Sequence, residues 1–140
     1  MADRITVVAA VVRRNGKLLL TSRPADKPPF GLEFPGGKVD KGENFSTALA
    51  RELREELDVN AIVLDPIYKM VKPNMDLWFI RTVIPESETI RCCEGQEYFW
   101  VDPQDKKALD ELFAQIPLLP GDWKFWNFLF CFIIEKTFFF

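Results

Sequence analysis

The stretch that decides the fold runs from Gly37 to Val59 and reads GKVDKGENFSTALARELREELDV. Within it, Glu52, Glu55 and Glu56 stand at positions i, i+3 and i+4. On a helix that turns by ~100° per residue, their side chains fall within an arc of roughly 100° on one face. The spacing therefore predicts a helix that aims three carboxylates at one place.

Carboxylates packed side by side repel one another, and a bound divalent cation removes that penalty. Carboxylate oxygens suit Mg²⁺ or Mn²⁺, and Mg²⁺ typically joins a few protein carboxylates to substrate phosphates. The pattern thus predicts a phosphate ester or anhydride as substrate. A Glu-rich helix can also be a solvated surface helix that is stabilised by ion pairs such as that of Arg51 with Glu55. The register of Gly37 and Glu43 with the glutamates favours the metal site.

The stretch resembles the Nudix box, Gly-x5-Glu-x7-Arg-Glu-U-x-Glu-Glu-x-Gly-U, in which U is aliphatic. Every fixed place matches except the last glycine, which Asp58 occupies. The chain also resembles the MutT-like branch of Nudix hydrolases along nearly its whole length, through Leu32–Lys38 before the box and Glu94–Glu97 with Trp100 after it. The resemblance implies one Nudix domain over residues 1–140, with an α/β fold: an α/β/α sandwich that holds a mixed β-sheet between helices.

The resemblance also implies roles for individual residues. Metal ligands would be Gly36, through its carbonyl, and Glu52, Glu55, Glu56 and Glu94. Catalytic residues would be Glu55, Glu56 or Glu94 as the base, with Arg51 orienting Glu43 and its neighbours by charge-assisted hydrogen bonds. Substrate-binding residues would be Arg23, Phe34, Lys38, Trp78 and Asp122, with Trp123 as a further aromatic candidate. Glu94 is equally compatible with a solvated loop acid, Arg23 with a surface arginine, and the aromatic residues with the core.

Base selection centres on Asp122, which stands where the branch carries an asparagine that reads oxidised guanine. An ionised Asp only accepts hydrogen bonds, so it suits the N1–H and 2-amino donors of guanine. Asp122 is also a good helix N-cap, and that alternative stays open.

The implied activity is that of a Mg²⁺-dependent nucleoside triphosphate pyrophosphohydrolase. Water attack would release a nucleoside monophosphate and pyrophosphate, and the enzyme would cleanse the pool of oxidised or noncanonical nucleotides such as 8-oxo-dGTP. A pyrimidine triphosphate, CTP or methyl-dCTP, is the alternative substrate. A catalytically silent nucleotide-sensing module is the alternative of another class.

The amino-acid composition excludes several classes of protein. The 140 residues with 48% hydrophobic content predict one globular domain, and the net charge of −3 with a pI near 5.1 argues against binding long nucleic acid. Histidine is absent, which excludes Ser-His and Cys-His hydrolases and HExxH metalloproteases. The three cysteines fit no disulfide framework and predict a cytoplasmic protein.

Hydrophobic periodicity and turn residues predict the remaining elements. Asn15-Gly16 is typical of a type I′ turn, and Asn44 or Ser46 is expected to cap the glutamate-bearing helix. A short strand ending in a sharp turn is expected within 31–37. Further strands are expected over Ile5–Val12, Lys17–Ser22, Ala61–Ile67, Leu77–Ile84 and Glu97–Val101. Helices are expected over Asp105–Phe113 and from Asp122 through Trp126 to Ile134.

The chain ends in an unusually apolar stretch, with Phe125–Ile134 followed by Phe138-Phe139-Phe140. It is shorter than the ~18 to 20 residues that span a bilayer, so no membrane span is expected. We expect a core helix whose excess apolar surface meets a second subunit, which would make a homodimer. Contact with a membrane surface is the alternative.

Overall fold

The computed structural model describes residues 4–24 and 26–129. The chain divides into two compact units, each made of two segments. The first unit consists of Met1–Val12 and Pro35–Glu94, and the second of Arg13–Phe34 and Gly95–Phe140.

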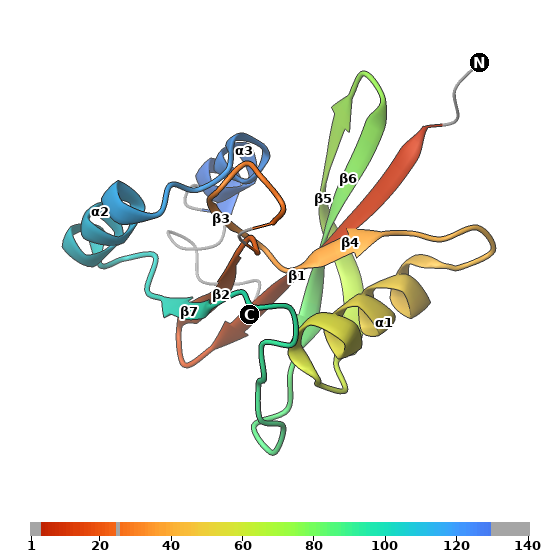
Figure 1. Cartoon of the computed structure of the whole chain (residues 1–140), viewed down its shortest axis with the longest axis horizontal. Helices are drawn as coiled ribbons and strands as arrows, with labels where there is room; N and C mark the ends of the chain where they lie inside the picture. Colours follow the sequence, from red (N-terminus) through yellow and green to blue (C-terminus); the bar gives the residue numbers. More distant parts are fainter. Residues whose placement is uncertain (1–3, 25, 130–140) are drawn as a thin grey trace. The chain divides into compact units, whose positions relative to one another are not determined.

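The first unit is a mixed sheet with one helix packed on it (Figure 1). Strand β1 runs antiparallel to β4 and parallel to β6, and β5 pairs antiparallel with β6. Helix α1 contacts β4 and β5. The elements are β1 (Ile5–Arg14), β4 (Gly36–Lys38), α1 (Phe45–Leu57), β5 (Ile62–Lys72) and β6 (Met75–Val83).

Helix α1 is bounded by two local signals. At its start, the side chain of Asn44 accepts a hydrogen bond of 2.8 Å from the backbone N–H of Thr47, so Asn44 and not Ser46 is the cap. At its end, Asp58 adopts the left-handed conformation with φ 54°. The apolar face predicted from the sequence is the buried face, formed by Ala48, Leu49, Leu53 and Leu57.

The β5–β6 hairpin is longer than the sequence predicts. The expected strand ended at Ile67, whereas β5 continues to Lys72. The predicted strand already contained Pro66, although a proline is disfavoured inside a strand. The pairing with β6 shifts register on both sides of Pro66, and this irregularity lets the strand continue.

The second unit is built around β2, which pairs antiparallel with β3, with β7 and with the last residues of β1. The β1–β2 turn forms as predicted, with positive φ angles of 51° at Asn15 and 77° at Gly16. The elements are β2 (Lys17–Ser22), β3 (Leu32–Glu33), β7 (Tyr98–Val101), α2 (Lys106–Gln115) and α3 (Pro120–Leu129).

Helix α3 begins earlier than the sequence predicts. Pro120 occupies its first position, where a proline is tolerated because its missing N–H has no helical partner. Asp122 therefore lies inside the first turn, and its predicted role as the N-cap is wrong. The predicted continuation of this helix to Ile134 and the Phe138–Phe140 segment lie outside the described residues. In the part of the chain that the structure describes, no helix combines the length and the apolar character needed to cross a membrane.

Candidate active site

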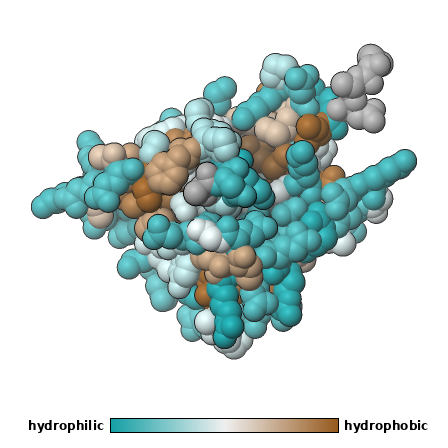
Figure 2. Space-filling model, in the orientation of Figure 1, coloured by the Kyte–Doolittle hydropathy of each residue, from teal (hydrophilic) through white to brown (hydrophobic). Residues whose placement is uncertain are grey.

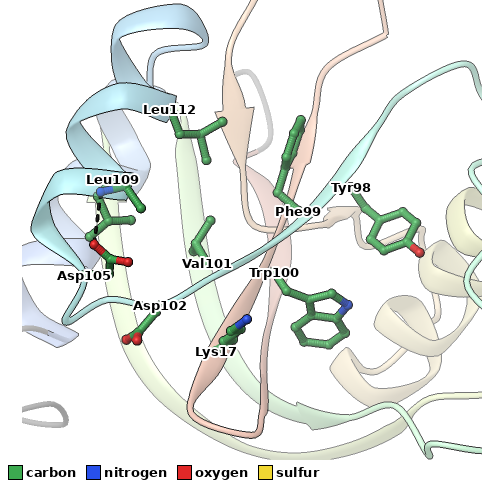
Figure 3. Close-up of a pocket in the computed structure, with 10 residues that line it drawn as sticks. Lys17, Tyr98, Phe99, Trp100, Val101, Asp102, Asp105, Leu109 and Leu112 are labelled. Atoms are coloured by element: carbon green, nitrogen blue, oxygen red, sulfur yellow. Dashed lines mark hydrogen bonds between the residues drawn. The ribbon is translucent and has the colours of Figure 1, made fainter.

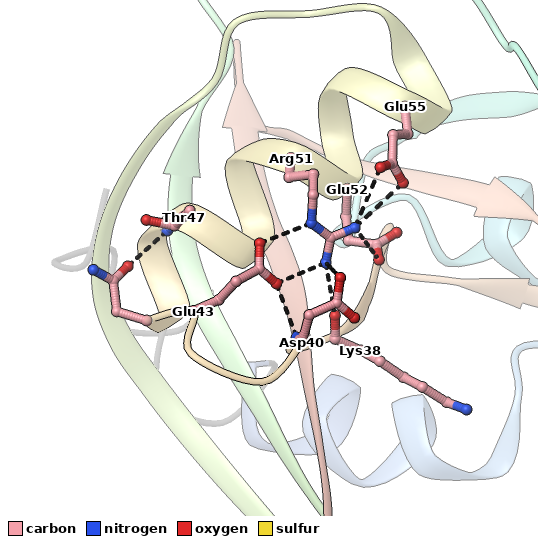
Figure 4. A network of polar contacts seen from close by, with 8 residues as sticks. Lys38, Asp40, Glu43, Thr47, Arg51, Glu52 and Glu55 are labelled. Atoms are coloured by element: carbon pink, nitrogen blue, oxygen red, sulfur yellow. Dashed lines mark hydrogen bonds and ion pairs between the residues drawn. The ribbon is translucent and has the colours of Figure 1, made fainter.

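Arg51 is the centre of a polar network in the first unit (Figure 4). Its guanidinium binds the carboxylate of Glu43 in a bidentate manner, with Nε–Oε2 and Nη2–Oε1 distances of 2.8 and 2.9 Å. The same group donates to Glu52 at 3.1 Å and lies 3.3 Å from Glu55. One arginine thus holds three of the box carboxylates in fixed positions, as the resemblance implies for Glu43.

The loop before α1 completes the network. Arg51 donates to the carbonyl oxygen of Lys38 at 3.0 Å and lies 3.4 Å from a carboxylate oxygen of Asp40. The backbone N–H of Asp40 donates to Glu43 at 2.8 Å. The ammonium group of Lys38 extends away from the network (Figure 4). Sequence reasoning missed Asp40, whose position between box residues carries no signal by itself.

The two glycines before the helix are required by close contacts. A Cβ atom on Gly36 would lie 2.0 Å from the carbonyl oxygen of Val8. A Cβ atom on Gly37 would lie 2.3 Å from the carboxylate carbon of Glu52. The carboxylate of Glu52 therefore rests against the backbone of Gly37, in space that any side chain at that position would take.

The charges of the cluster perturb one another. Burial raises the pKa of Glu52, repulsion from Glu55 and Glu94 adds to the shift, and Arg51 opposes it. Hydrogen bonds from Arg51 and from the backbone of Asp40 lower the pKa of Glu43. The side chain of Glu52 is 16% exposed and that of Glu55 53% exposed. The carboxylates of Glu52, Glu55 and Glu94 thus interact electrostatically, and the group is open to solvent on the side of Glu55. Hydrophilic residues predominate over α1 in Figure 2.

The loop that carries Glu94 is attached to the end of α1. The backbone N–H of Cys93 donates to the carbonyl of Glu56, and that of Arg91 to the carbonyl of Leu57, both at 2.9 Å. These bonds bring Glu94 to the helix that carries the other acids. The prediction that Glu94 belongs with the cluster agrees with this geometry, and its chemical role stays a prediction.

The donor set fits a divalent metal ion. Over the described residues, no three acidic or cysteine side chains converge on a common point, because Arg51 draws Glu52 and Glu55 to itself. Yet Glu52 is a partly buried carboxylate under repulsion from two further acids, and a divalent cation would relieve that repulsion. All donors are hard oxygens, as Mg²⁺ and Mn²⁺ prefer.

The remaining predicted residues divide between the units. Trp78, in the first unit, packs on Phe45 with ring centroids 5.2 Å apart, and the ammonium of Lys69 lies 5.0 Å from its ring. Arg23, in the second, donates to the carbonyl of Lys27 at 2.9 Å and pairs with Glu33 at 3.4 Å.

Phe34 and Asp122 belong to the second unit. Phe34 is only 3% exposed and packs edge-on against Phe125 at 5.2 Å, so it is a core residue in this structure. Asp122 is 8% exposed, while Trp123 is 41% exposed and contacts Phe113 at 5.6 Å.

Known proteins resemble this chain in sequence and in fold. The model of the NUDIX domain matches residues 2–120. The chain belongs to the Nudix family. It is 37% identical over 123 residues to the CTP pyrophosphohydrolase of Escherichia coli, a match that covers 82% of this chain and 88% of that protein. It is 38% identical over 117 residues to the 8-oxo-dGTP diphosphatase of Haemophilus influenzae, covering 79% of this chain and 83% of that protein.

A solved structure of MutT, from a study of the Aliivibrio salmonicida and Vibrio cholerae proteins, is also similar. The TM-score is 0.61 and the identity 27%, with 82% of this chain and 98% of that chain covered. These likenesses confirm the predicted class of hydrolase and the predicted α/β sandwich with a mixed sheet. Nudix hydrolases generally use divalent metal ions.

Proposed function

We propose that this Nudix hydrolase is a Mg²⁺-dependent nucleoside triphosphate pyrophosphohydrolase that releases a nucleoside monophosphate and pyrophosphate. The observation that carries the proposal is the Arg51 network. It fixes Glu43, Glu52 and Glu55, and the pKa of Glu52 responds to both Glu55 and Glu94. Such an acidic group without histidine suits phosphate chemistry assisted by a divalent ion.

Five groups of the chain would hold the ion. They are the carboxylates of Glu52, Glu55, Glu56 and Glu94 and the carbonyl oxygen of Gly36. When bound, Mg²⁺, or Mn²⁺ in its place, neutralises charge on the phosphate oxygens and acidifies a bound water. The close contact of Glu52 with the Gly37 backbone supports this set, because it places the carboxylate beside the two glycines of β4.

The side chains would divide the remaining work. A carboxylate oxygen of Glu55, Glu56 or Glu94 would take the proton from the attacking water oxygen. Arg51 would act as a positioning residue, since its bonds to Glu43 and Glu52 fix where these oxygens point. Glu43 would in turn hold the guanidinium plane through its bidentate contact.

We propose substrate-binding roles for single residues, each taken from the family resemblance. Arg23 and Lys38 supply cations for the phosphates, and Trp78 supplies an aromatic face. Phe34 would support the base from the core, where it packs on Phe125. Asp122 would read the base as a hydrogen-bond acceptor.

Purine and pyrimidine bases both offer donors to an acceptor at Asp122. Guanine and 8-oxoguanine offer N1–H and the 2-amino group, whereas cytosine offers its exocyclic amino group. The relatives that act on 8-oxo-dGTP and on CTP match this chain at 38% and 37% identity. We propose 8-oxo-dGTP or a related noncanonical purine triphosphate as the substrate, with CTP or methyl-dCTP as the second candidate.

The test is pyrophosphate release from a panel of canonical, oxidised and methylated triphosphates with Mg²⁺. The wild type is compared with Glu52→Gln, and with Glu111→Gln on the exposed surface of α2 as the matched control. Glu52→Gln is expected to fold, because burial already disfavours the charge at that position. Turnover should be lost in Glu52→Gln alone. A wild type inactive on every triphosphate would favour the silent nucleotide-sensing module, and turnover of dinucleotides alone would refute the triphosphate assignment.

We further propose that residues 1–140 act as one Nudix domain in the cytoplasm. The family model draws on both units, which supports a single functional domain. Among the described residues, Cys92 and Cys93 are not joined in a disulfide, which suits a reducing compartment. A homodimer through the apolar C-terminal helix remains a proposal that sedimentation of the wild type and of Phe128→Ser would test.

A further inference from the structure

Glu33, the last residue of β3, is an acid of the second unit that has no part in the proposed reaction. Its carboxylate oxygen Oε2 lies 3.4 Å from Nη1 of Arg23, and the side chains of the two residues are 30% and 29% exposed. Arg23 is the residue for which we propose contact with the substrate phosphates. An inference about Glu33 therefore rests on the proposed function, through the role of Arg23.

The guanidinium of Arg23 is held at two points. Its Nε donates to the carbonyl oxygen of Lys27 at 2.9 Å, and its Nη1 donates to Glu33 at 3.4 Å. Because a guanidinium is planar and rigid, two contacts through different nitrogens fix its orientation. Among the described residues, none accepts a hydrogen bond from Nη2 of Arg23. The two N–H groups of Nη2 are thus available to phosphate oxygens.

Glu33 lies on a face of the sheet that a ligand can reach. Glu33 and Tyr98 both pair with Thr21 of β2, so the three side chains project to the same face. In Figure 3, the ring of Tyr98 lies on one side of β7, and Leu109 and Leu112 of α2 lie on the other. Glu33 therefore faces away from α2. Tyr98 is 41% exposed, so this face is accessible from solvent.

The surroundings of Glu33 oppose its charge in part. Burial raises the pKa of Glu33, whereas the cations of Arg23 and Lys27 act to lower it. A neutral side chain at this position would avoid the cost of burying a charge. The negative charge of Glu33 also repels a phosphate, so any favourable effect of Glu33 on substrate binding must come from the geometry it imposes on Arg23.

We propose that Glu33 is a positioning residue that holds the guanidinium of Arg23 ready for the phosphate oxygens of the substrate. The carboxylate of Glu33 itself touches no substrate. A long arginine side chain that is already ordered loses less conformational entropy when the nucleotide binds. This gain exceeds the repulsion between the carboxylate and the phosphates, because Arg23 and Lys27 partly neutralise the carboxylate.

The experiment is calorimetric titration of the full chain, with Mg²⁺, by the α,β-methylene analogues of dGTP and CTP, which bind without being hydrolysed. Glu33→Ala should weaken binding of the tighter analogue about tenfold, the effect of about one hydrogen bond to a charged group. Glu33→Gln keeps an acceptor for Nη1 and removes the charge, so it should bind at least as tightly as the wild type. Asp65→Ala, which breaks the exposed ion pair with Arg81 in the first unit, is the matched control and should bind as the wild type does.

A double-mutant cycle with Arg23→Ala distinguishes positioning from a general effect on folding, because a folding defect acts whether or not Arg23 is present. In the Arg23→Ala background, Glu33→Ala should cause no further loss of affinity. In turnover assays, Glu33→Ala should raise KM and leave kcat close to the wild-type value.

Three results would each overturn the proposal. They are an equal loss of affinity from Glu33→Ala with and without Arg23, binding by Glu33→Gln as weak as that by Glu33→Ala, and no binding of either analogue by the wild type. A wild type that hydrolyses no triphosphate but binds an analogue, with the expected order of the variants, would refute the proposed hydrolysis and leave the role of Glu33 supported.

Discussion

The acidic cluster of the first unit and the aromatic residues of the second are assembled in different ways. Arg51, Glu52 and Glu55 come from neighbouring turns of α1, so sequence spacing alone brings them together. Phe34 and Phe125 meet although 90 residues separate them, which only the tertiary fold can achieve. The comparison teaches that the carboxylates carried by α1 are placed by local structure, whereas the aromatic contact of the second unit depends on packing between distant segments.

The largest effect is expected from a substitution in the acidic cluster of the first unit. Glu56→Gln removes a carboxylate that we assign to metal binding or to proton abstraction. It should lower kcat by about 10² to 10⁴-fold, since general-base groups contribute that much. Steady-state kinetics with Mg²⁺ measures the effect, and circular dichroism verifies folding. Full turnover in Glu56→Gln would remove this residue from the reaction.

Arg51→Lys tests whether the network positions the acids. Lysine keeps the charge but cannot form the bidentate contact with Glu43, so the carboxylates should lose their fixed orientation. We expect kcat to fall about 10 to 100-fold, the usual effect of losing a group that orients metal ligands. The Mg²⁺ concentration for half-maximal activity should rise in parallel. A variant with a raised KM for nucleotide and unaltered kcat would instead make Arg51 a substrate ligand.

Asp122→Asn tests the role that we propose for Asp122, in the second unit, in selecting the base. Asparagine replaces one acceptor oxygen with a donor, so it loses one of the two guanine donors, N1–H or the 2-amino group, but can pair with the N3 acceptor of cytosine. The ratio of kcat/KM for 8-oxo-dGTP over CTP should fall on the order of tenfold, the effect of about one hydrogen bond to a charged group. Competition between the two triphosphates measures this ratio directly. An unchanged ratio would restrict Asp122 to a structural role in α3.

The smallest effect is expected at Asp58. This residue has φ 54° at the end of α1, a conformation that glycine adopts more freely. Asp58→Gly should raise the free energy of unfolding by roughly 1 kcal/mol or less. Asp58→Ala is the control and should lower it, because alanine tolerates positive φ poorly. Urea denaturation distinguishes the two, and a clear loss of stability in Asp58→Gly would contradict the account.

Features encoded by adjacent residues could be predicted from the sequence. The turn at Asn15-Gly16, with positive φ at both residues, follows from local backbone chemistry, as does the cap at Asn44, one of the two predicted candidates, and the structure has both. The helix that carries Glu52, Glu55 and Glu56 likewise follows from their spacing, whereas the convergence of three carboxylates on one point, which the spacing also predicted, is absent over the described residues.

Features that depend on distant contacts could not be predicted. The predicted strand ended at Ile67, but pairing with β6 carries β5 on to Lys72. An N-cap role for Asp122 was one of two alternatives, and Pro120 rules it out by starting the helix two residues earlier. Asp40 joins the Arg51 network through a loop whose geometry no motif records.

The most direct test of the account is a Mn²⁺ titration of the metal-free protein, followed by the relaxation of water protons. It compares the wild type with Glu52→Gln and needs no turnover. We predict saturable Mn²⁺ binding by the wild type and an affinity at least about tenfold lower in Glu52→Gln. Equal affinity in the two proteins would show that the carboxylates of α1 do not hold the ion, and would contradict the central claim.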